Sequence, residues 1–358
     1  MTGPPILDRV PPLQQSRLPE FDFIRTLAIF GVVWIHISGL FIDRVPYGSI
    51  EYWGFIALNQ LQRFCVPAFI LSSGFFLAYF PKNSVRIDRT LIGRLQRVIL
   101  PYLFWSILVE IYYAAFDLKE RSISQVIANF VLGRSLYTYY FIVIIVQFYV
   151  IWWLLNRLKI KNSIQLLAMS LCIQLGFTII RYAASFEIVP PLHHLSDRLV
   201  FDWIFYFFLG WFIGERYDRF RQFATKYRQL FAIVAVLAFA FSCLECYFID
   251  VVWSDFDFSR SFYKLSSQIY AIACFFMFLN WSRSSSSIEQ IARFSFAIYL
   301  THAISIENFS LWLPYTILNS SFLAFLVMFT CVWSTTYGIV YVLNCTLPKP
   351  ASKYLLGI

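Results

Sequence analysis

Two residues of the first long apolar stretch, Arg25 and His36, are of types that carry charge or move protons. Eleven residues of α-helix separate their side chains by about 20° around the helix axis and roughly 16 Å along it. They therefore share one helix face at different heights. Histidine titrates close to neutral pH and suits a general base in a dry site. Taken singly, Arg25 also fits a helix-end anchor, and His36 a hydrogen-bonded packing residue.

A third ionisable group, Arg63, stands in the second apolar stretch beside Asn59. Counted from the far end of that stretch it lies about 14 Å deep, which matches the depth of His36. An arginine this far inside an apolar segment needs a partner or a water-filled cavity. Pro67 and Gly74 follow and indicate an interrupted helix that permits close backbone approach. We therefore expect a polar cavity against the first segment.

Arg94 and Arg97 stand at positions i and i+3, so both project from one helix face where the third apolar stretch begins. Nearby basic residues make this the strongest basic cluster of the chain; they are Lys82, Arg86 and Arg89. One interpretation is a site for a phosphorylated ligand, because arginine makes bidentate contacts to phosphate. The cluster is also typical of cytoplasmic loops of membrane proteins and of contacts with anionic lipid.

Tyr299 and His302 lie one turn apart near the middle of the ninth apolar stretch. Core packing and a second polar wall of the cavity explain them equally well. The loop that contains His193, His194 and Asp197 provides no complete metal shell. A solvated loop explains it better, and we expect no metal.

The seven cysteines lie mostly inside apolar stretches and indicate no disulfide framework. Cys243 and Cys246 form a C-x-x-C pair, but no thioredoxin-like βαβ pattern surrounds them. We interpret them as small packing residues.

The chain that must position these groups is far too apolar for a soluble protein. Of its 358 residues, 59% are hydrophobic and 14% charged, whereas soluble domains carry about a quarter charged residues. Apolar runs of about 20 residues recur along nearly the whole length, which predicts an all-α polytopic membrane protein, a bundle of about ten transmembrane helices. The expected spans are 22–42, 54–80, 97–116, 137–155, 163–181, 199–214, 230–249, 264–281, 293–312 and 319–342. The expected organisation is an N-terminal tail over 1–20, one transmembrane domain over 21–345 and a C-terminal tail over 346–358.

The distribution of basic residues indicates how this bundle is oriented. The first 20 residues are polar and lack the apolar core and cleavage site of a signal peptide. With the N-terminus inside, most of the 29 basic residues fall into cytoplasmic segments, as the positive-inside rule requires. We therefore predict a multi-pass protein of the cell (inner or plasma) membrane, in contact with its lipid, with both termini cytoplasmic. The net charge of +9 then requires no nucleic acid.

Several short sequence elements follow one another in order between residues 22 and 302. They are Asp22-x-x-Arg25 followed after ten residues by His36, VPAFILSSGF at 66–75, Arg94-x-x-Arg97 leading into Pro101 and Tyr102, FDWIFYFFLGWFIG at 201–214, and SFAIYLTH at 295–302. Each element is weak by itself, but the ordered set resembles the membrane-bound acyltransferase-3 family. Arg63, just before VPAF, resembles the branch that contains enterobacterial common antigen O-acetyltransferase.

The chain departs from the family pattern in two ways. Ala68 stands where a bulkier residue is usual, and the serine before Gly74 is doubled. The chain also lacks the extra span and the C-terminal SGNH hydrolase-like domain that some members carry. Transfer is therefore expected to finish within the membrane domain.

The resemblance implies an O-acyltransferase that moves an acyl group, commonly acetyl, from cytoplasmic acyl-CoA to a hydroxyl of a surface glycan, a lipid-linked sugar or a small metabolite. Arg94 and Arg97 would hold the phosphates of the coenzyme, with Arg25 close to the donor entrance. His36 would deprotonate the acceptor hydroxyl. Arg63 would stabilise the oxyanion or orient the acceptor. The residues expected to bind substrate are Asp22, Asn59, Tyr299 and His302.

The sequence leaves several points open. Asp43 and Glu51, in the first outer loop, are both candidates for orienting the imidazole of His36. The alternative function is a transporter or flippase for a glycan intermediate, because polar groups at mid-depth also mark substrate paths. A non-catalytic scaffold would not explain His36 and Arg63 at matching depth. The choice between acetyl and succinyl, the acceptor and its side of the membrane, and oligomeric state, a homo-oligomer included, remain open.

Overall fold

The described part of the chain consists of helices joined by turns and loops. The computed structural model describes residues 17–80, 87–116, 118–119, 121–160, 162–190, 196–281, 283, 285–312 and 321–358. The helices of the first half are α1 (Pro19–Ile42), α2 (Ile50–Gln60), α3 (Cys65–Tyr79), α4 (Ile87–Ala115), α5 (Ile123–Leu132), η2 (Tyr137–Tyr139), α6 (Tyr140–Arg157) and α7 (Ser163–Ser185). Those of the second half are η3 (Ser196–Arg198), η4 (Val200–Asp202), α8 (Ile204–Glu215), α9 (Tyr217–Lys226), α10 (Arg228–Phe248), η5 (Ile249–Trp253), α11 (Phe256–Ser259), α12 (Leu265–Phe278), α13 (Ser286–Trp312), α14 (Ser321–Thr346) and α15 (Lys349–Leu355).

Seven helical segments of the described chain are long and apolar enough to cross a membrane. They are Pro19–Ile42, Ile50–Tyr79, Ile87–Ala115, Tyr137–Arg157, Ser163–Ser185, Arg228–Trp253 and Ser321–Thr346. This confirms the predicted all-α polytopic class. Two other expected spans, 199–214 and 264–281, coincide with the shorter apolar helices α8 and α12. The expected span 293–312 falls within α13, which has 27 residues but includes more polar side chains.

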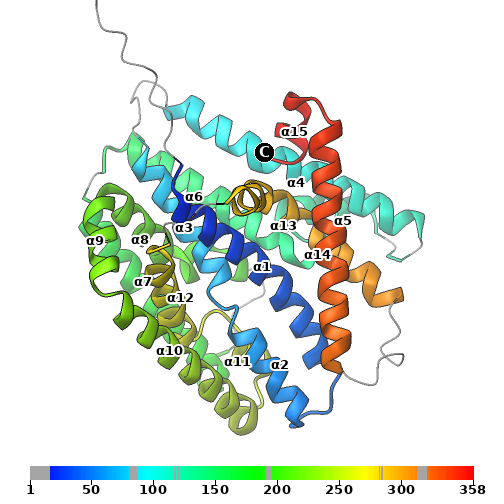
Figure 1. The fold of residues 1–358 in the computed structure, drawn as a ribbon, viewed down its shortest axis with the longest axis horizontal. Coiled ribbons are helices and arrows are strands. Elements are labelled where there is room, and N and C mark those ends of the chain that lie inside the picture. Colours follow the sequence, from blue (N-terminus) through cyan, green and yellow to red (C-terminus); the bar gives the residue numbers. More distant parts are fainter. Residues whose placement is uncertain are drawn as a thin grey trace, which may run out of the picture.

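Helix α1 crosses the middle of the bundle in Figure 1, with α14 on one side and α10 and α12 on the other. Its sequence explains this central position, because apolar side chains point from it in several directions. Ile24, Ile29, Val33 and Ile37 are each 0% exposed. A helix that is apolar all round is expected in the core of a membrane bundle. The residues of α1 are therefore held by packing on several faces at once.

The tightest contact between helices in this bundle joins α3 to α8 through glycine. A Cβ atom added to Gly74 would lie 2.0 Å from the carbonyl oxygen of Phe207, and one added to Gly210 would lie 2.0 Å from that of Leu71. Small residues allow such approach of helix backbones in membranes. Gly74 therefore brings the backbone of α3 against that of α8.

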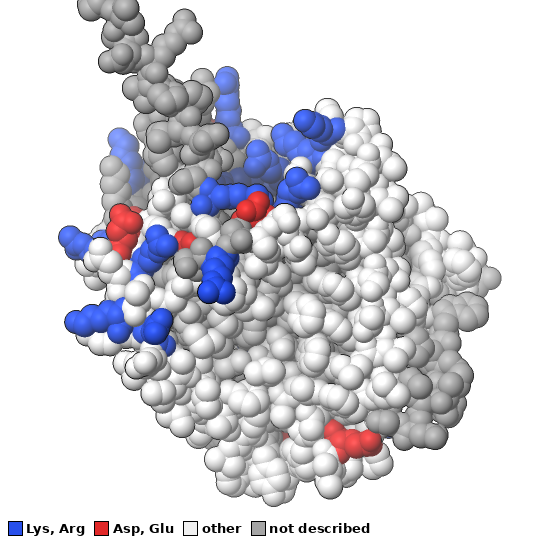
Figure 2. Space-filling view, viewed as in Figure 1, with Lys and Arg blue, Asp and Glu red and all other residues white. Residues whose placement is uncertain are grey.

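Basic side chains gather at one end of the molecule. Figure 2 shows Lys and Arg near the start of α1 and over the region of α9, while the surface below them on this face is almost free of charge. The start of α1 and the C-terminus lie toward this same end (Figure 1). Such asymmetry agrees with the distribution used to predict orientation. That the basic end faces the cytoplasm stays a prediction.

The expected C-terminal tail, 346–358, contains the helix α15, and this helix packs onto α4. Trp105 Nε1 donates a hydrogen bond of 3.1 Å to the carbonyl oxygen of Leu355, and Leu356 is 0% exposed. Residues 1–16 of the expected N-terminal tail lie outside the described residues, and α1 already begins at Pro19.

Candidate functional site

A single unbroken helix, α1, carries both Arg25 and His36. Pro19 begins this helix, where its fixed backbone angle favours the first turn. Both side chains are partly exposed although most of their neighbours in α1 are buried. The predicted arrangement of two functional groups at two heights on one helix is therefore present, and neither side chain is fully enclosed by protein.

Arg63 lies in a break between α2 and α3. Residues 61–64 form tight turns in which backbone N–H groups bond three residues back, as from Arg63 to Gln60 at 3.1 Å. Pro67 cannot donate to the carbonyl of Arg63, which weakens the helix at this point. The hydroxyl of Tyr270 donates to the carbonyl of Leu61 at 2.8 Å and so satisfies part of the broken ladder. The sequence predicted this interruption from Pro67.

Asn59 connects Arg63 to the helix that carries His36. Its Nδ2 donates to the carbonyl oxygen of Ile35 at 2.9 Å and to Oγ of Ser38 at 3.0 Å. Its Oδ1 accepts a hydrogen bond from Nη2 of Arg63. Because Ile35 directly precedes His36, this one amide holds the guanidinium at the level of the imidazole. Arg63 is therefore linked through Asn59 to the turn of α1 that carries His36, and their common depth in the membrane stays a prediction.

Arg63 is only 7% exposed and has unused donors. Its guanidinium lies 4.6 Å from the ring centre of Phe262, a cation–π contact. Its Nε has no hydrogen-bond partner, and no carboxylate among the described residues pairs with it. A buried cation without an anion is a ready binding site for developing negative charge.

The imidazole of His302, from α13, lies against the imidazole of His36. The two ring centres are 5.4 Å apart. His302 is 0% exposed, and its Nδ1 lies 2.7 Å from the carbonyl oxygen of Tyr299. The hydroxyl of Tyr299 in turn donates to the carbonyl of Thr138. Of the two interpretations of Tyr299 and His302, the structure favours the polar wall for His302, because it faces the proposed base.

Tyr137 is a neighbour of His36 that the sequence did not reveal. Its ring centre lies 5.1 Å from that of His36 and its side chain is 49% exposed. Tyr137 is the first residue of the expected span 137–155, a position typical of aromatic residues at the membrane–water interface. Only the packing of η2 beside α1 shows that it borders the same space as His36.

A second set of charged side chains lies toward the other end of α1. It includes Asp22, Arg25 and Arg94. Asp22 lies 3.4 Å from Nε of Arg17, which also forms an ion pair with Glu289. Arg25 lies within electrostatic range of Asp22 and of Tyr149. Arg94 lies 5.9 Å from the ring centre of Tyr149.

Tyr149, in α6, therefore lies near both Arg25 and Arg94. Arg97 is exposed one turn further along α4 than Arg94. None of the described residues accepts a hydrogen bond from the side chain of Arg94 or Arg97. Arg94 thus lies over Tyr149 and Arg97 is exposed, and the predicted grouping of Arg25 with Arg94 and Arg97 stays a prediction.

Neither acid considered for orienting His36 contacts it. Oδ1 of Asp43 accepts a hydrogen bond of 2.7 Å from Arg260, and Oε2 of Glu51 accepts one of 3.2 Å from Ser321. Partial burial would lower the pKa of Arg260, but its hydrogen bonds with Tyr52 and Asp43 raise it. Asp43 therefore stabilises the loop that carries Arg260.

The remaining sequence motifs contribute no site among the described residues. Among the described residues no group of acids, histidines and cysteines could hold a metal ion. His193 and His194 lie outside those residues, and Asp197 pairs with Arg181 at 3.0 Å. Cys246 is buried, with Gln60 donating to its Sγ at 3.9 Å, which agrees with a packing role.

Lys264, the first residue of the expected span 264–281, is a second buried cation. It is 0% exposed, and its Nζ donates to Oε1 of Gln60 at 3.2 Å and to the carbonyl of Ser242 at 3.1 Å. Ser242 also donates to Gln60. Lys264 thus supports the end of α2 directly before the break that contains Arg63.

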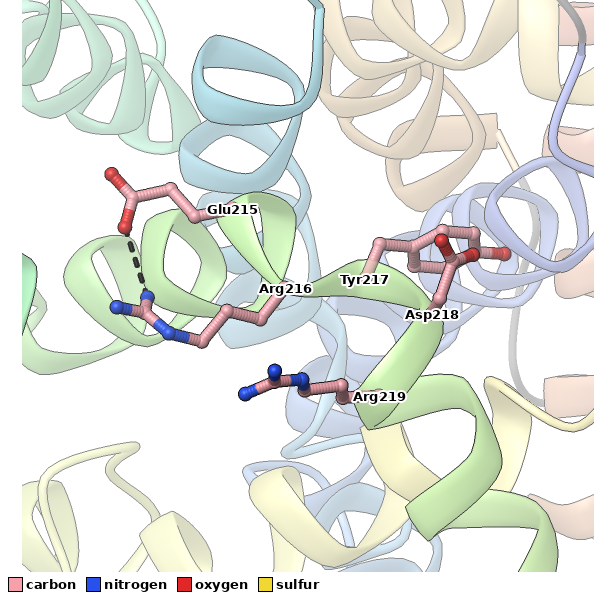
Figure 3. A pocket seen from close by; sticks show the side chains of 5 residues that line it. All are labelled: Glu215, Arg216, Tyr217, Asp218 and Arg219. Carbon is pink, nitrogen blue, oxygen red and sulfur yellow. Dashed lines mark hydrogen bonds and ion pairs between the residues drawn. The ribbon is translucent and has the colours of Figure 1, made fainter.

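Two surface cavities lie away from these groups. The larger, about 530 Å³, is lined by Glu215, Arg216, Tyr217, Asp218 and Arg219 at the corner between α8 and α9. Figure 3 shows Arg216 turned back to its ion pair with Glu215, at 2.9 Å. The smaller, about 340 Å³, lies between α2 and α14 and is lined by Ile50, Glu51, Gly54, Phe55, Leu58 and Phe322. Neither contains a residue predicted to act on donor or acceptor.

Comparison of the sequence with known proteins identifies its family. A family model described as an acyltransferase domain matches residues 18–344. The chain is 28% identical over 259 residues to a "Probable poly-beta-1,6-N-acetyl-D-glucosamine export protein" of Staphylococcus aureus, covering 70% of this chain and 71% of that one. It is 29% identical over 263 residues to the protein of the same name from Staphylococcus epidermidis, covering 70% of each chain. No solved structure matches significantly. The chain belongs to the acyltransferase-3 family.

Proposed function

We propose that this membrane protein transfers an acyl group, with acetyl as the first candidate, from acyl-CoA to a hydroxyl group of a cell-surface polysaccharide. One observation carries the proposal: a partly exposed imidazole, His36, lies beside a buried guanidinium, Arg63, that has no anionic partner among the described residues. A base for the hydroxyl and a fixed positive charge for the oxyanion are the two groups that acyl transfer requires.

The donor side of the proposal rests on the groups around Tyr149. Arg25 and Arg94 both lie near this residue, toward the basic end of the molecule. Guanidinium groups that lack a bound carboxylate suit the phosphates of coenzyme A. Arg25 also shares a helix with His36, so a slender pantetheine arm that follows α1 would lead from these arginines to the imidazole.

In the reaction, the hydroxyl oxygen of the acceptor attacks the thioester carbonyl while His36 takes the hydroxyl proton. The carbon–oxygen bond forms, negative charge develops on the carbonyl oxygen, and Arg63 stabilises it. The carbon–sulfur bond then breaks, and the thiolate of coenzyme A takes the proton from the imidazolium. General-base help contributes about 10²- to 10⁴-fold to such steps.

The acceptor class is suggested by the relatives. Their printed names concern export of poly-β-1,6-N-acetyl-D-glucosamine, a polymer whose sugar units carry free hydroxyl groups. We therefore propose a surface polysaccharide as acceptor ahead of a small metabolite. The donor would bind from the cytoplasm and the protein would reside in the plasma or inner membrane.

The test uses the full chain, purified and reconstituted in lipid vesicles, with acetyl-CoA labelled in the acetyl group. Acceptors are fractionated envelope glycans and β-1,6-linked N-acetylglucosamine oligosaccharides. We expect label to enter a glycan fraction, and His36→Gln to lower this rate by about 10²-fold or more. Unchanged coenzyme A binding in His36→Gln is the control for folding. A His36→Gln variant as active as the parent would remove His36 from the role of base.

Export of an unmodified polymer is the second candidate, and the printed names of the relatives favour it. The same vesicles distinguish the two functions. Oligosaccharide that crosses the membrane without gaining label, at a rate independent of acetyl-CoA, would support export and contradict the acyl-transfer proposal. Label bound to the oligosaccharide would support transfer.

A further inference from the structure

We propose that His302 orients His36 by accepting a hydrogen bond from one ring nitrogen of His36, which leaves the other nitrogen to face the acceptor hydroxyl. This inference rests on the proposed function, because it assigns a partner to the proposed base. His302 acts through His36 and is a positioning residue. A base held by a third group is the usual arrangement in acyl transfer, where a carboxylate most often takes this place.

The first argument is that the ring of His302 is held in one tautomer. Its Nδ1 lies 2.7 Å from the carbonyl oxygen of Tyr299, and a carbonyl can only accept. Nδ1 therefore carries the hydrogen, and Nε2 of the neutral ring presents a lone pair. Nε2 is buried and has no hydrogen-bond partner among the described residues. The structure thus contains an acceptor that lacks a donor.

The second argument is the position of that acceptor. The ring centres of His302 and His36 are 5.4 Å apart and the rings are inclined by 34°. The described structure contains no hydrogen bond between the two rings, but at this separation a turn of the partly exposed His36 ring would bring one of its nitrogens within reach of Nε2. His302 is 0% exposed, and the hydroxyl of Tyr299, one turn before it, donates to the carbonyl of Thr138. The acceptor is therefore fixed in place before any substrate arrives.

The third argument is that other groups do not perform this task. No Asp or Glu of the described chain forms a hydrogen bond or ion pair with His36; Asp43 and Glu51 are bound to Arg260 and Ser321. Of the described aromatic and charged groups near His36, Tyr137 is half exposed and Arg63 is a cation. A cation cannot accept a hydrogen bond from an imidazole N–H.

A neutral partner has a chemical consequence for the proposed reaction. When His36 takes the hydroxyl proton it becomes an imidazolium, and His302 holds it by hydrogen bonding without neutralising its charge. The imidazolium therefore returns its proton readily to the leaving thiolate of coenzyme A. No proton passes to His302, so the balance of the transfer step is unchanged.

The test compares two substitutions of His302 by residues with an amide side chain. One keeps the donor function of the imidazole ring, and the other keeps its acceptor function. His302→Asn keeps a short donor for the carbonyl of Tyr299 and lacks an acceptor at the position of Nε2. His302→Gln reaches that position with its amide oxygen. Nitrogen-15 NMR of labelled histidine in lipid nanodiscs measures the tautomer of His36, whose signals are assigned by their loss in His36→Gln. Acetyl transfer is measured on the same samples.

We expect one dominant His36 tautomer in the parent protein and in His302→Gln, and a mixture of both in His302→Asn. Acetyl transfer should fall about 10- to 100-fold in His302→Asn, an effect typical of residues that orient a reactive imidazole, and recover in His302→Gln. Coenzyme A affinity should stay constant, since neither variant changes the donor arginines.

An unchanged His36 tautomer in His302→Asn would overturn the inference, whatever the activity of the variant. Equal loss of tautomer preference in both variants would also overturn it, because the amide oxygen of glutamine should restore the acceptor. If the tautomer responds as expected but the parent protein transfers no acetyl group, the pairing of the two histidines stands and the proposed function fails.

Discussion

At the scale of single residues, the candidate site is built from buried polar groups that are left partly unsatisfied. Nε2 of His302 and Nε of Arg63 have no hydrogen-bond partner among the described residues. Each such group costs about 1–3 kcal/mol of stability. Other buried atoms of the described chain also have no partner, such as Nε1 of Trp203, but these two belong to groups that can carry charge or accept a proton. The groups near His36 are therefore prepared for charge or protons that arrive with substrate.

Arg94 and Arg97 allow a direct test of the donor site. In the double variant Arg94→Ala/Arg97→Ala, we expect coenzyme A affinity to fall at least tenfold, because two charge-assisted contacts to phosphate are lost. Isothermal titration of the reconstituted protein measures this. The matched control is Arg89→Ala, an exposed arginine of the same helix α4. Equal affinities in the double variant and the control would support the lipid-anchor interpretation.

Spacing within one helix allowed part of the site to be predicted. Arg25 and His36 are related by helix geometry alone, and Arg63 by its depth in the next span. The contact between His36 and His302 depends on how α1 packs against α13, and residues 266 positions apart carry no local signal of it. The same reason explains why Tyr137 and the buried Lys264 were missed.

At the scale of elements, the break between α2 and α3 and the glycine contact between α3 and α8 determine where Arg63 lies. The break turns Arg63 inward, and the contact with α8 fixes the helix that follows it. The break between α2 and α3 was predicted from Pro67. The partner of Gly74 could not be predicted, since a glycine in a span indicates a close neighbour without saying which one.

The glycine contact predicts a large loss of stability on adding one methyl group. In Gly74→Ala the new Cβ would lie 2.0 Å from a backbone oxygen, so α3 and α8 must separate. We expect the variant to unfold at lower temperature, with a loss of about 1–3 kcal/mol or more. Thermal unfolding in detergent, followed by tryptophan fluorescence, measures the change.

Gly176→Ala in α7 is the control, because nothing lies within 4 Å of its added Cβ. There, alanine should be neutral or stabilise the helix by up to about 1 kcal/mol. A Gly74→Ala protein as stable as the Gly176→Ala protein would show that the two helices are not in contact as described.

At the scale of the whole molecule, the asymmetry of charge predicts its orientation in the membrane. The basic end in Figure 2 lies at the start of α1, and the loop between α1 and α2 lies at the opposite end in Figure 1. Hydropathy predicted the class of fold because apolar length is a local property. The shorter α8 and α12 show its limit, since a helix enclosed by neighbours need not span the full apolar layer.

Two exposed positions test this orientation. Cysteine is introduced at Lys349, beside the C-terminus, or at Ile50, which is 92% exposed at the start of α2. In intact cells, a membrane-impermeant maleimide should label Ile50→Cys and leave Lys349→Cys unlabelled until the membrane is opened. The parent protein, with its own cysteines, provides the background. The reverse pattern would place the donor arginines outside the cell.

The backbone contact between α3 and α8 also limits how the molecule can move. Two helices that meet carbonyl to Cα cannot slide past each other, because a shift of one residue would drive a side chain into the opposing chain. α3 and α8 therefore stay fixed relative to each other during turnover. Arg63, which directly precedes α3, keeps its position with them. Any opening that admits the proposed donor, coenzyme A, or the proposed polysaccharide acceptor must then arise between other helices of the bundle.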